Sequence, residues 1–165
     1  MDLLFVVALA ATGAYMLNTQ QQRRRIVLLA QHLQPYQIER LMETLTQGSL
    51  RAMGEQDPER RQQVLNLLAS SEAQLSEQFE RFAADFRRVP APLARASRLA
   101  LGLPFATQLL PGATFDMREA IDVHARGIAR VARNDAGLSP RDKAFTMTAE
   151  LLLMQHTCHW FCKSK

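Results

Sequence analysis

Apolar residues are concentrated most densely at the start of the chain. From Leu3 to Leu17 no residue is charged, and Asn18 and Thr19 extend this uncharged stretch. Its length reaches about the lower limit of ~17 residues for a helix that crosses the hydrocarbon core of a bilayer. Pro35 disfavours helical geometry in the residue before it. The pattern therefore predicts one helix that runs from a membrane to about Gln34.

Two other interpretations of this apolar segment remain open. A cleaved signal peptide needs positive charge before its apolar run, whereas only Asp2 and the α-amino group precede this one. The triplet Ala8-Leu9-Ala10 resembles a cleavage site, but cleavage there would leave a hydrophobic region of only five residues. The segment could instead be a buried helix of a soluble protein. We expect a transmembrane anchor at residues 1–22.

Three consecutive arginines, Arg23, Arg24 and Arg25, follow the apolar segment within one or two helical turns. Basic residues beside a membrane span are retained on the cytoplasmic side. We therefore expect a basic juxtamembrane extension of the helix at residues 23–34. Residues 35–165 would form a cytoplasmic domain, held at the cell inner membrane by a single span.

Beyond Pro35 the turn-forming residues are spaced as they are between helices. A short helix is predicted from Tyr36 to Gln47, with Gly48 as its stop. Asp57 and Pro58 then provide an N-cap and a first helical residue. Nothing interrupts the pattern that follows until Pro90, which predicts a helix of about thirty residues.

This long helix has a single apolar seam, formed by residues at steps of three and four, in which Glu72 fills the one gap. The seam could pack within its own domain, or it could form a coiled-coil contact with a partner or a second copy. The residues predicted for such a partner contact are Leu75, Phe79, Phe82 and Phe86.

The segment from Val89 to Phe115 is the most ambiguous part of the pattern. Four prolines divide it, and its stretch from Leu99 to Phe115 contains no charge, whereas four arginines lie upstream of that stretch. A basic flank beside a broken apolar stretch is typical of a segment in the headgroup region of a membrane. The alternative is an irregular connection folded over the core.

The last third of the chain predicts a helical hairpin with a turn at residues 134–137. Its first helix begins at Thr114 or Asp116, and Ser139 and Pro140 start its second. The apolar stripe of the first helix is Met117, Ile121, His124, Ile128 and Val131. The face shared on the second helix is Phe145, Thr148, Leu152, Gln155 and His159.

Composition supports an all-α fold. Ala, Leu, Gln, Glu and Arg dominate beyond the first 30 residues, and their unbranched side chains lose little freedom in a helix. The fold class expected is a single-pass transmembrane helix followed by a helical bundle with one long helix and a C-terminal hairpin. Seventeen Arg and three Lys against sixteen acidic residues give a net charge of +4. That excess is mild and does not indicate nucleic-acid binding.

Chemistry-bearing residues gather near the C-terminus. Both cysteines and two of the four histidines lie within seven residues, and as neighbours on a helix they could ligate zinc. The candidate ligands are His156, Cys158, His159 and Cys162. The alternatives are reduced thiols that pack against other residues, or reversible acylation close to a membrane. A disulfide fits poorly, because side chains four apart on a helix are nearly parallel.

His124 interrupts an apolar stripe, and a buried imidazole can be a base, a ligand or a hydrogen-bonded core residue. In an antiparallel hairpin it should face Thr148 or Ala149, at least two turns from the cysteines.

No phosphate-binding glycine loop or nucleophile elbow is present. The sequence predicts a non-catalytic, membrane-anchored interaction or scaffold protein, whose partners are membrane lipid and a protein or a second copy. The alternative is a metal- or thiol-based sensor or enzyme at the His/Cys cluster.

Overall fold

The computed structural model describes residues 2–98 and 109–163. This part of the chain is all-α with very little strand, as the sequence predicts. Two three-residue strands, β1 (Arg95–Ser97) and β2 (Thr114–Asp116), form an antiparallel ladder, and a short 3-10 helix, η1 (Pro111–Ala113), precedes β2. The α-helices are α1 (Asp2–Leu33), α2 (Ile38–Gly54), α3 (Pro58–Phe86), α4 (Ala91–Ala94), α6 (Met117–Arg133) and α7 (Pro140–Lys163).

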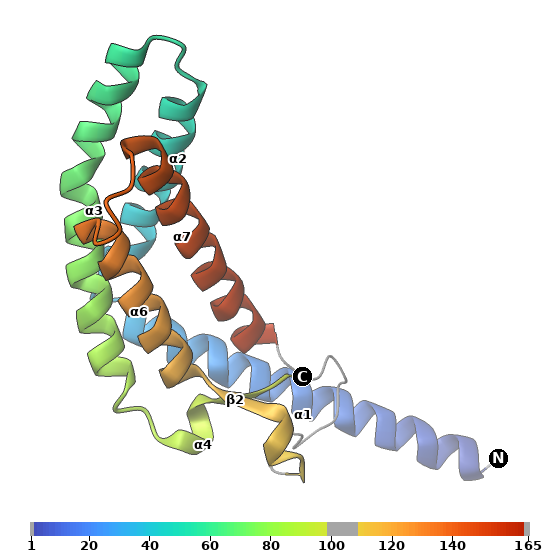
Figure 1. Cartoon of the computed structure of the whole chain (residues 1–165). Coiled ribbons are helices and arrows are strands. Elements are labelled where there is room, and N and C mark those ends of the chain that lie inside the picture. Colours follow the sequence, from blue (N-terminus) through green and yellow to red (C-terminus); the bar gives the residue numbers. More distant parts are fainter. Residues whose placement is uncertain (1, 99–108, 164–165) are drawn as a thin grey trace.

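Helix α1 is continuous, and its N-terminal half projects alone from the helical body (Figure 1). Every described side chain from Leu3 to Gly13 is exposed, whereas Leu29 near the other end is buried in the core. The helix ends at Leu33, just before Pro35, as predicted. Among the described residues it is the one helix whose length and apolar composition would let it cross a membrane.

Helices α2 and α3 form a hairpin. The carboxylate of Asp57 accepts a hydrogen bond from the backbone N–H of Glu59 at 2.9 Å, which confirms the predicted N-cap. The predicted stop at Gly48 is wrong, since α2 continues to Gly54. A Cβ atom at Gly48 would lie 2.6 Å from a methyl carbon of Leu68. The glycine therefore permits close packing of α2 on α3 and does not end a helix.

The core is built around the apolar seam of α3. Its large side chains are buried against residues of α1, α2, α6 and α7, and the aromatic rings meet edge to face or tilted. Glu72, the one polar member, is buried too, and its carboxylate lies 2.5 Å from the Nζ atom of Lys143 on α7. This ion pair joins the long helix to the C-terminal hairpin.

The region that the sequence left ambiguous contains α4, β1, η1 and β2. Residues 99–108 lie outside the described residues, so the predicted membrane contact of Leu99 to Phe115 falls largely outside them as well. The short strands within this region were not predicted. They pair in register, with Arg95 opposite Asp116 and Ser97 opposite Thr114.

The C-terminal hairpin forms as predicted. Asp116 caps α6, and Asn134 ends it with a left-handed backbone (φ 56°), while its side chain hydrogen-bonds both backbone groups of Leu138. The stripe predicted for α6 faces the core, with His124 only partly buried. The residues predicted to share one face of α7 do share it, and that face is the outer one, on which Thr148 is partly buried and the other four are exposed. The inward residues of α7 are Ala144, Met147, Leu151, Met154 and Phe161.

Candidate membrane-proximal site

The C-terminal end of α7 lies against α1 at the point where α1 leaves the helical body. The side-chain amide of Gln22 donates a hydrogen bond to the backbone carbonyl of Lys163 at 3.2 Å. The guanidinium of Arg25 lies over the ring of Phe161, 5.8 Å from its centroid. Of the predicted membrane-flanking arginines, Arg25 therefore packs into the junction between the first and last helices, while Arg23 and Arg24 are exposed.

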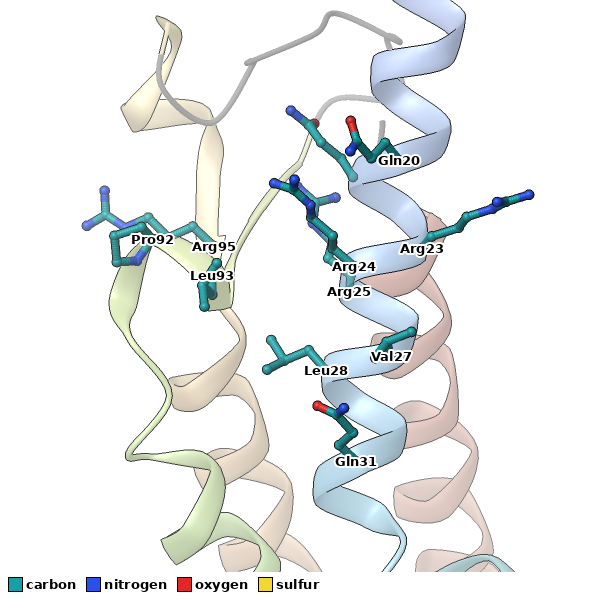
Figure 2. Close-up of a pocket in the computed structure, with 11 residues that line it drawn as sticks. Gln20, Arg23, Arg24, Arg25, Val27, Leu28, Gln31, Pro92, Leu93 and Arg95 are labelled. Carbon is teal, nitrogen blue, oxygen red and sulfur yellow. The ribbon is translucent and has the colours of Figure 1, made fainter.

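A groove opens between α1 and the segment formed by α4 and β1 (Figure 2). It encloses about 720 Å³. The wall on α1 contributes Gln20, Gln21, Arg23, Arg24, Arg25, Val27, Leu28 and Gln31, and the opposite wall contributes Pro92, Leu93 and Arg95. The sequence predicted the three consecutive arginines but not the position of Arg95 in the opposite wall, because Arg95 lies 70 positions after Arg25 and no local pattern connects the two.

The opposite wall is fixed to the body by polar contacts. The indole N–H of Trp160 on α7 donates to the carbonyl of Ser97 at 3.0 Å. Arg118 donates to the carbonyl of Val89 at 3.2 Å and binds both carboxylate oxygens of Asp116. This guanidinium holds the pKa of Asp116 below its usual range. The segment that faces α1 is thereby anchored to both α6 and α7.

The residues predicted for partner contact, Leu75, Phe79, Phe82 and Phe86, lie elsewhere. All four side chains have no exposed surface in the folded chain. The structure thus has the seam packed within its own domain, which was the other interpretation of the pattern. A partner that binds the folded domain would have to contact other residues.

Helix α7 offers an exposed apolar face instead. Phe145, Leu152 and Leu153 retain 49%, 53% and 58% of their surface, while the opposite face of the helix is buried in the core. A helix that is apolar on both sides normally has both sides covered. Solvated apolar clusters of this kind commonly mark interaction sites.

The four candidate zinc ligands occupy the last turns of α7, where His156 and His159 are exposed and Cys158 and Cys162 are partly buried. Both cysteines are free. Among the described residues, no three His, Cys, Asp or Glu side chains are grouped so that they could hold a metal ion. Burial raises the pKa of Cys158 to about 12 and also raises that of Cys162. Because the thiolate is the nucleophile, this burial disfavours nucleophilic chemistry by the two thiols at neutral pH.

His124 lies between Glu150 and Thr157 of α7, so its predicted position opposite Thr148 or Ala149 was too close to the start of that helix. Its Nε2 atom lies 2.9 Å from the Oγ1 atom of Thr157, and its Nδ1 atom lies 3.9 Å from a carboxylate oxygen of Glu150. Burial lowers the pKa of His124, and Glu150 partly opposes this effect. The three side chains form a polar bridge between α6 and α7.

The fold and the junction define an all-α protein with an N-terminal helix long and apolar enough to cross a membrane, and with a basic groove where that helix meets the helical body. No protein-family model matches the chain, and neither a curated protein nor a solved structure proved similar to it.

Proposed function

We propose that this chain holds a helical interaction domain at the cytoplasmic face of the cell inner membrane. One observation carries the proposal. Helix α1 is unbroken. Its N-terminal half is apolar and exposed, and this half continues directly into the C-terminal half, which packs in the core through Leu29. A membrane anchor built in this way is rigidly joined to the domain and sets its distance and orientation. The proposed role is non-catalytic.

The arginines at residues 23–25 support the cytoplasmic orientation, since positive charge beside a span is retained on that side. Fusion of reporters to the C-terminus of the full-length chain tests it. A green fluorescent protein fusion should fluoresce, and an alkaline phosphatase fusion should be inactive, because that enzyme needs an oxidising compartment to form its disulfides. An active phosphatase fusion would refute the proposed orientation.

The exposed face of α7 supports contact with a protein, because Leu152 and Leu153 are large apolar residues left uncovered by the domain. A photoreactive amino acid at Leu152 in the full-length chain should crosslink in cells. The matched control is Leu67, which is 76% exposed on α3 without forming part of this face. An adduct of twice 18.6 kDa would identify a second copy, and another mass a different protein. Crosslinking at neither Leu152 nor Leu153 would contradict the proposed contact.

The alternative function, a metal- or thiol-based sensor or enzyme, stays a prediction that no contact described above favours. If this alternative were correct, purified full-length protein would contain zinc. The variant with both Cys158→Ser and Cys162→Ser would lose that metal, whereas His32→Gln, a change on another helix, would retain it.

A further inference from the structure

The groove between α1 and the α4–β1 segment has a composition that suits one ligand chemistry. Four of its eleven lining residues are arginines and three are glutamines, and none of the described residues that line it carries a carboxylate. Its volume falls in the range of small-molecule sites. Guanidinium groups bind phosphate oxygens through paired, charge-assisted hydrogen bonds. We propose that this groove binds a phosphate group, held by Arg24 on the α1 wall.

The geometry of α1 selects Arg24 from the three consecutive arginines. Residues spaced by three or four share one face of a helix, so Gln20, Arg24, Leu28 and Gln31 face the groove together. Figure 2 shows Arg24 directed toward the α4–β1 wall and Arg23 extending on the other side of α1. Arg25 is already engaged with Phe161. Arg24 is therefore the binding residue on this wall, and Arg23 is its natural control.

The charges near the groove leave Arg24 and Arg95 available. Within the described part of the chain, neither residue belongs to an ion pair. The acidic residue Asp116 lies opposite Arg95 in the ladder. Because Arg118 binds both of its oxygens, Asp116 offsets only part of the positive charge of Arg95. An anionic group is thus the ligand that this electrostatic environment favours.

The position of the groove on α1 indicates where the phosphate comes from. The twenty uncharged residues from Leu3 to Gln22 span about 30 Å as a helix, which equals the thickness of the hydrocarbon core. Residues 23–25 then fall among the lipid headgroups. The proposed membrane anchoring, on which this inference rests, places the mouth of the groove at the level of the lipid phosphates. An anionic phospholipid is therefore the expected ligand.

The test uses full-length protein in nanodiscs of phosphatidylcholine with or without phosphatidylglycerol, and native mass spectrometry to count the phosphatidylglycerol molecules retained. We expect retention of one molecule. Arg24→Gln should weaken retention by about tenfold or more, the effect of losing hydrogen bonds to a charged group. Arg95→Gln should weaken it by less than about fivefold, because the Arg95 guanidinium extends away from α1 (Figure 2). Arg23→Gln should weaken it by less than about fivefold, the effect of one charge near the surface. Equal losses of phosphatidylglycerol retention in all three variants would refute the proposed site and indicate nonspecific electrostatic attraction between the protein surface and the lipid.

Inorganic phosphate distinguishes the two sources of the ligand. If the lipid is the source, free phosphate should not displace phosphatidylglycerol. Displacement by phosphate, with loss of phosphate binding in Arg24→Gln, would support the site but assign it to a soluble phosphate. Binding of neither probe would overturn the proposal. Thermal unfolding and membrane retention are measured first for each variant, so that a chain released from the membrane refutes the anchoring, whereas a retained chain without lipid preference refutes this inference alone.

Discussion

The first half of α1 and the seam of α3 are both apolar and helical, yet the fold treats them in opposite ways. Leu75, Phe79 and Phe82 on α3 have no exposed surface, whereas Leu3, Leu4 and the other large apolar residues up to Leu9 retain 57–79% of theirs. The difference lies in the angular distribution. Apolar residues on α3 occupy one stripe, which other helices can cover, while those on α1 surround the helix. A helix of the second kind needs lipid or another protein on all sides.

The exposed apolar surface of α1 is large enough to contribute a substantial free energy when it is covered. Covering a Leu, Val or Phe side chain contributes about 1.5–3 kcal/mol. Six such side chains between Leu3 and Leu9 are left bare by the domain. Their transfer to lipid would thus contribute on the order of 10 kcal/mol. Of the four changes that follow, the first three alter one of these two apolar regions or the ion pair of Glu72, and the fourth alters the His124 bridge between α6 and α7.

Charge in the bare half of α1 should have the largest effect. The double substitution Leu9→Arg and Gly13→Arg places two arginines near the middle of the span, each costing about 2.5–3.5 kcal/mol on insertion. We expect most of the chain to leave the membrane fraction, measured by quantitative blotting after fractionation. Leu67→Arg, at an exposed position on α3, should leave membrane retention unchanged. Full retention of the double variant would show that these residues do not lie in hydrocarbon.

Truncation in the buried seam should destabilise the domain without releasing the chain. Phe82→Ala removes a fully buried ring that contacts Phe79 and Phe86, and we expect a loss of about 3–5 kcal/mol in the free energy of unfolding. Urea unfolding of the detergent-solubilised full-length chain measures it. Leu67→Ala should cost less than about 0.5 kcal/mol, because that side chain is exposed. A loss for Phe82→Ala as small as that of the control would contradict the packing described.

Loss of the ion pair of Glu72, the one charged residue of the seam, should have a smaller effect on the stability of the domain. Lys143→Met leaves the buried carboxylate of Glu72 without its partner at 2.5 Å, which should destabilise the domain by about 1–3 kcal/mol. The double variant with Glu72→Leu should recover part of that loss, since no buried charge remains. Urea unfolding compares both with the parent chain. Equal stability of all three would mean that water, and not Lys143, satisfies Glu72.

Protonation of His124 on acidification should have the smallest effect on the stability of the domain. Its pKa in the folded chain lies below the ordinary value of 6.5, because burial disfavours the charged form. The unfolded chain therefore binds the proton more strongly, so the contribution of this residue is complete above the ordinary pKa and declines as the pH falls below it. His124→Gln should reduce the loss of stability between about pH 7.5 and pH 5.5. An unchanged pH dependence would show that the bridge to Thr157 does not depend on a neutral imidazole.

Local signals in the sequence were sufficient for the long helices and for several of their ends. Pro35, the Asp57 cap and the seam of α3 act through neighbours along the chain, and each was predicted from those neighbours. Gly48 was misread as a stop, because its role depends on Leu68 in the next helix. The shared face of α7 was recognised, but that helix is apolar on both sides, so periodicity could not show which side lies in the core.

The candidate site was predicted only in part, for the same physical reason. Arg23, Arg24 and Arg25 are adjacent in the sequence and stand out beside an uncharged segment. The segment that carries Arg95 lines the same groove because Trp160 and Arg118 fix that segment beside α1. The register of the hairpin, which brings His124 to Thr157, likewise depends on packing that no local pattern specifies.

The most direct test of the central claim is a carbonate wash of membranes from bacteria that express either the full-length chain or a version without residues 1–22. The account predicts that the full-length chain stays in the washed membrane and that the shortened chain becomes soluble. A full-length chain recovered in the soluble fraction would contradict it. Leu3 to Leu17 would then be covered by protein, and the anchor, its orientation and the lipid site would all have to be abandoned.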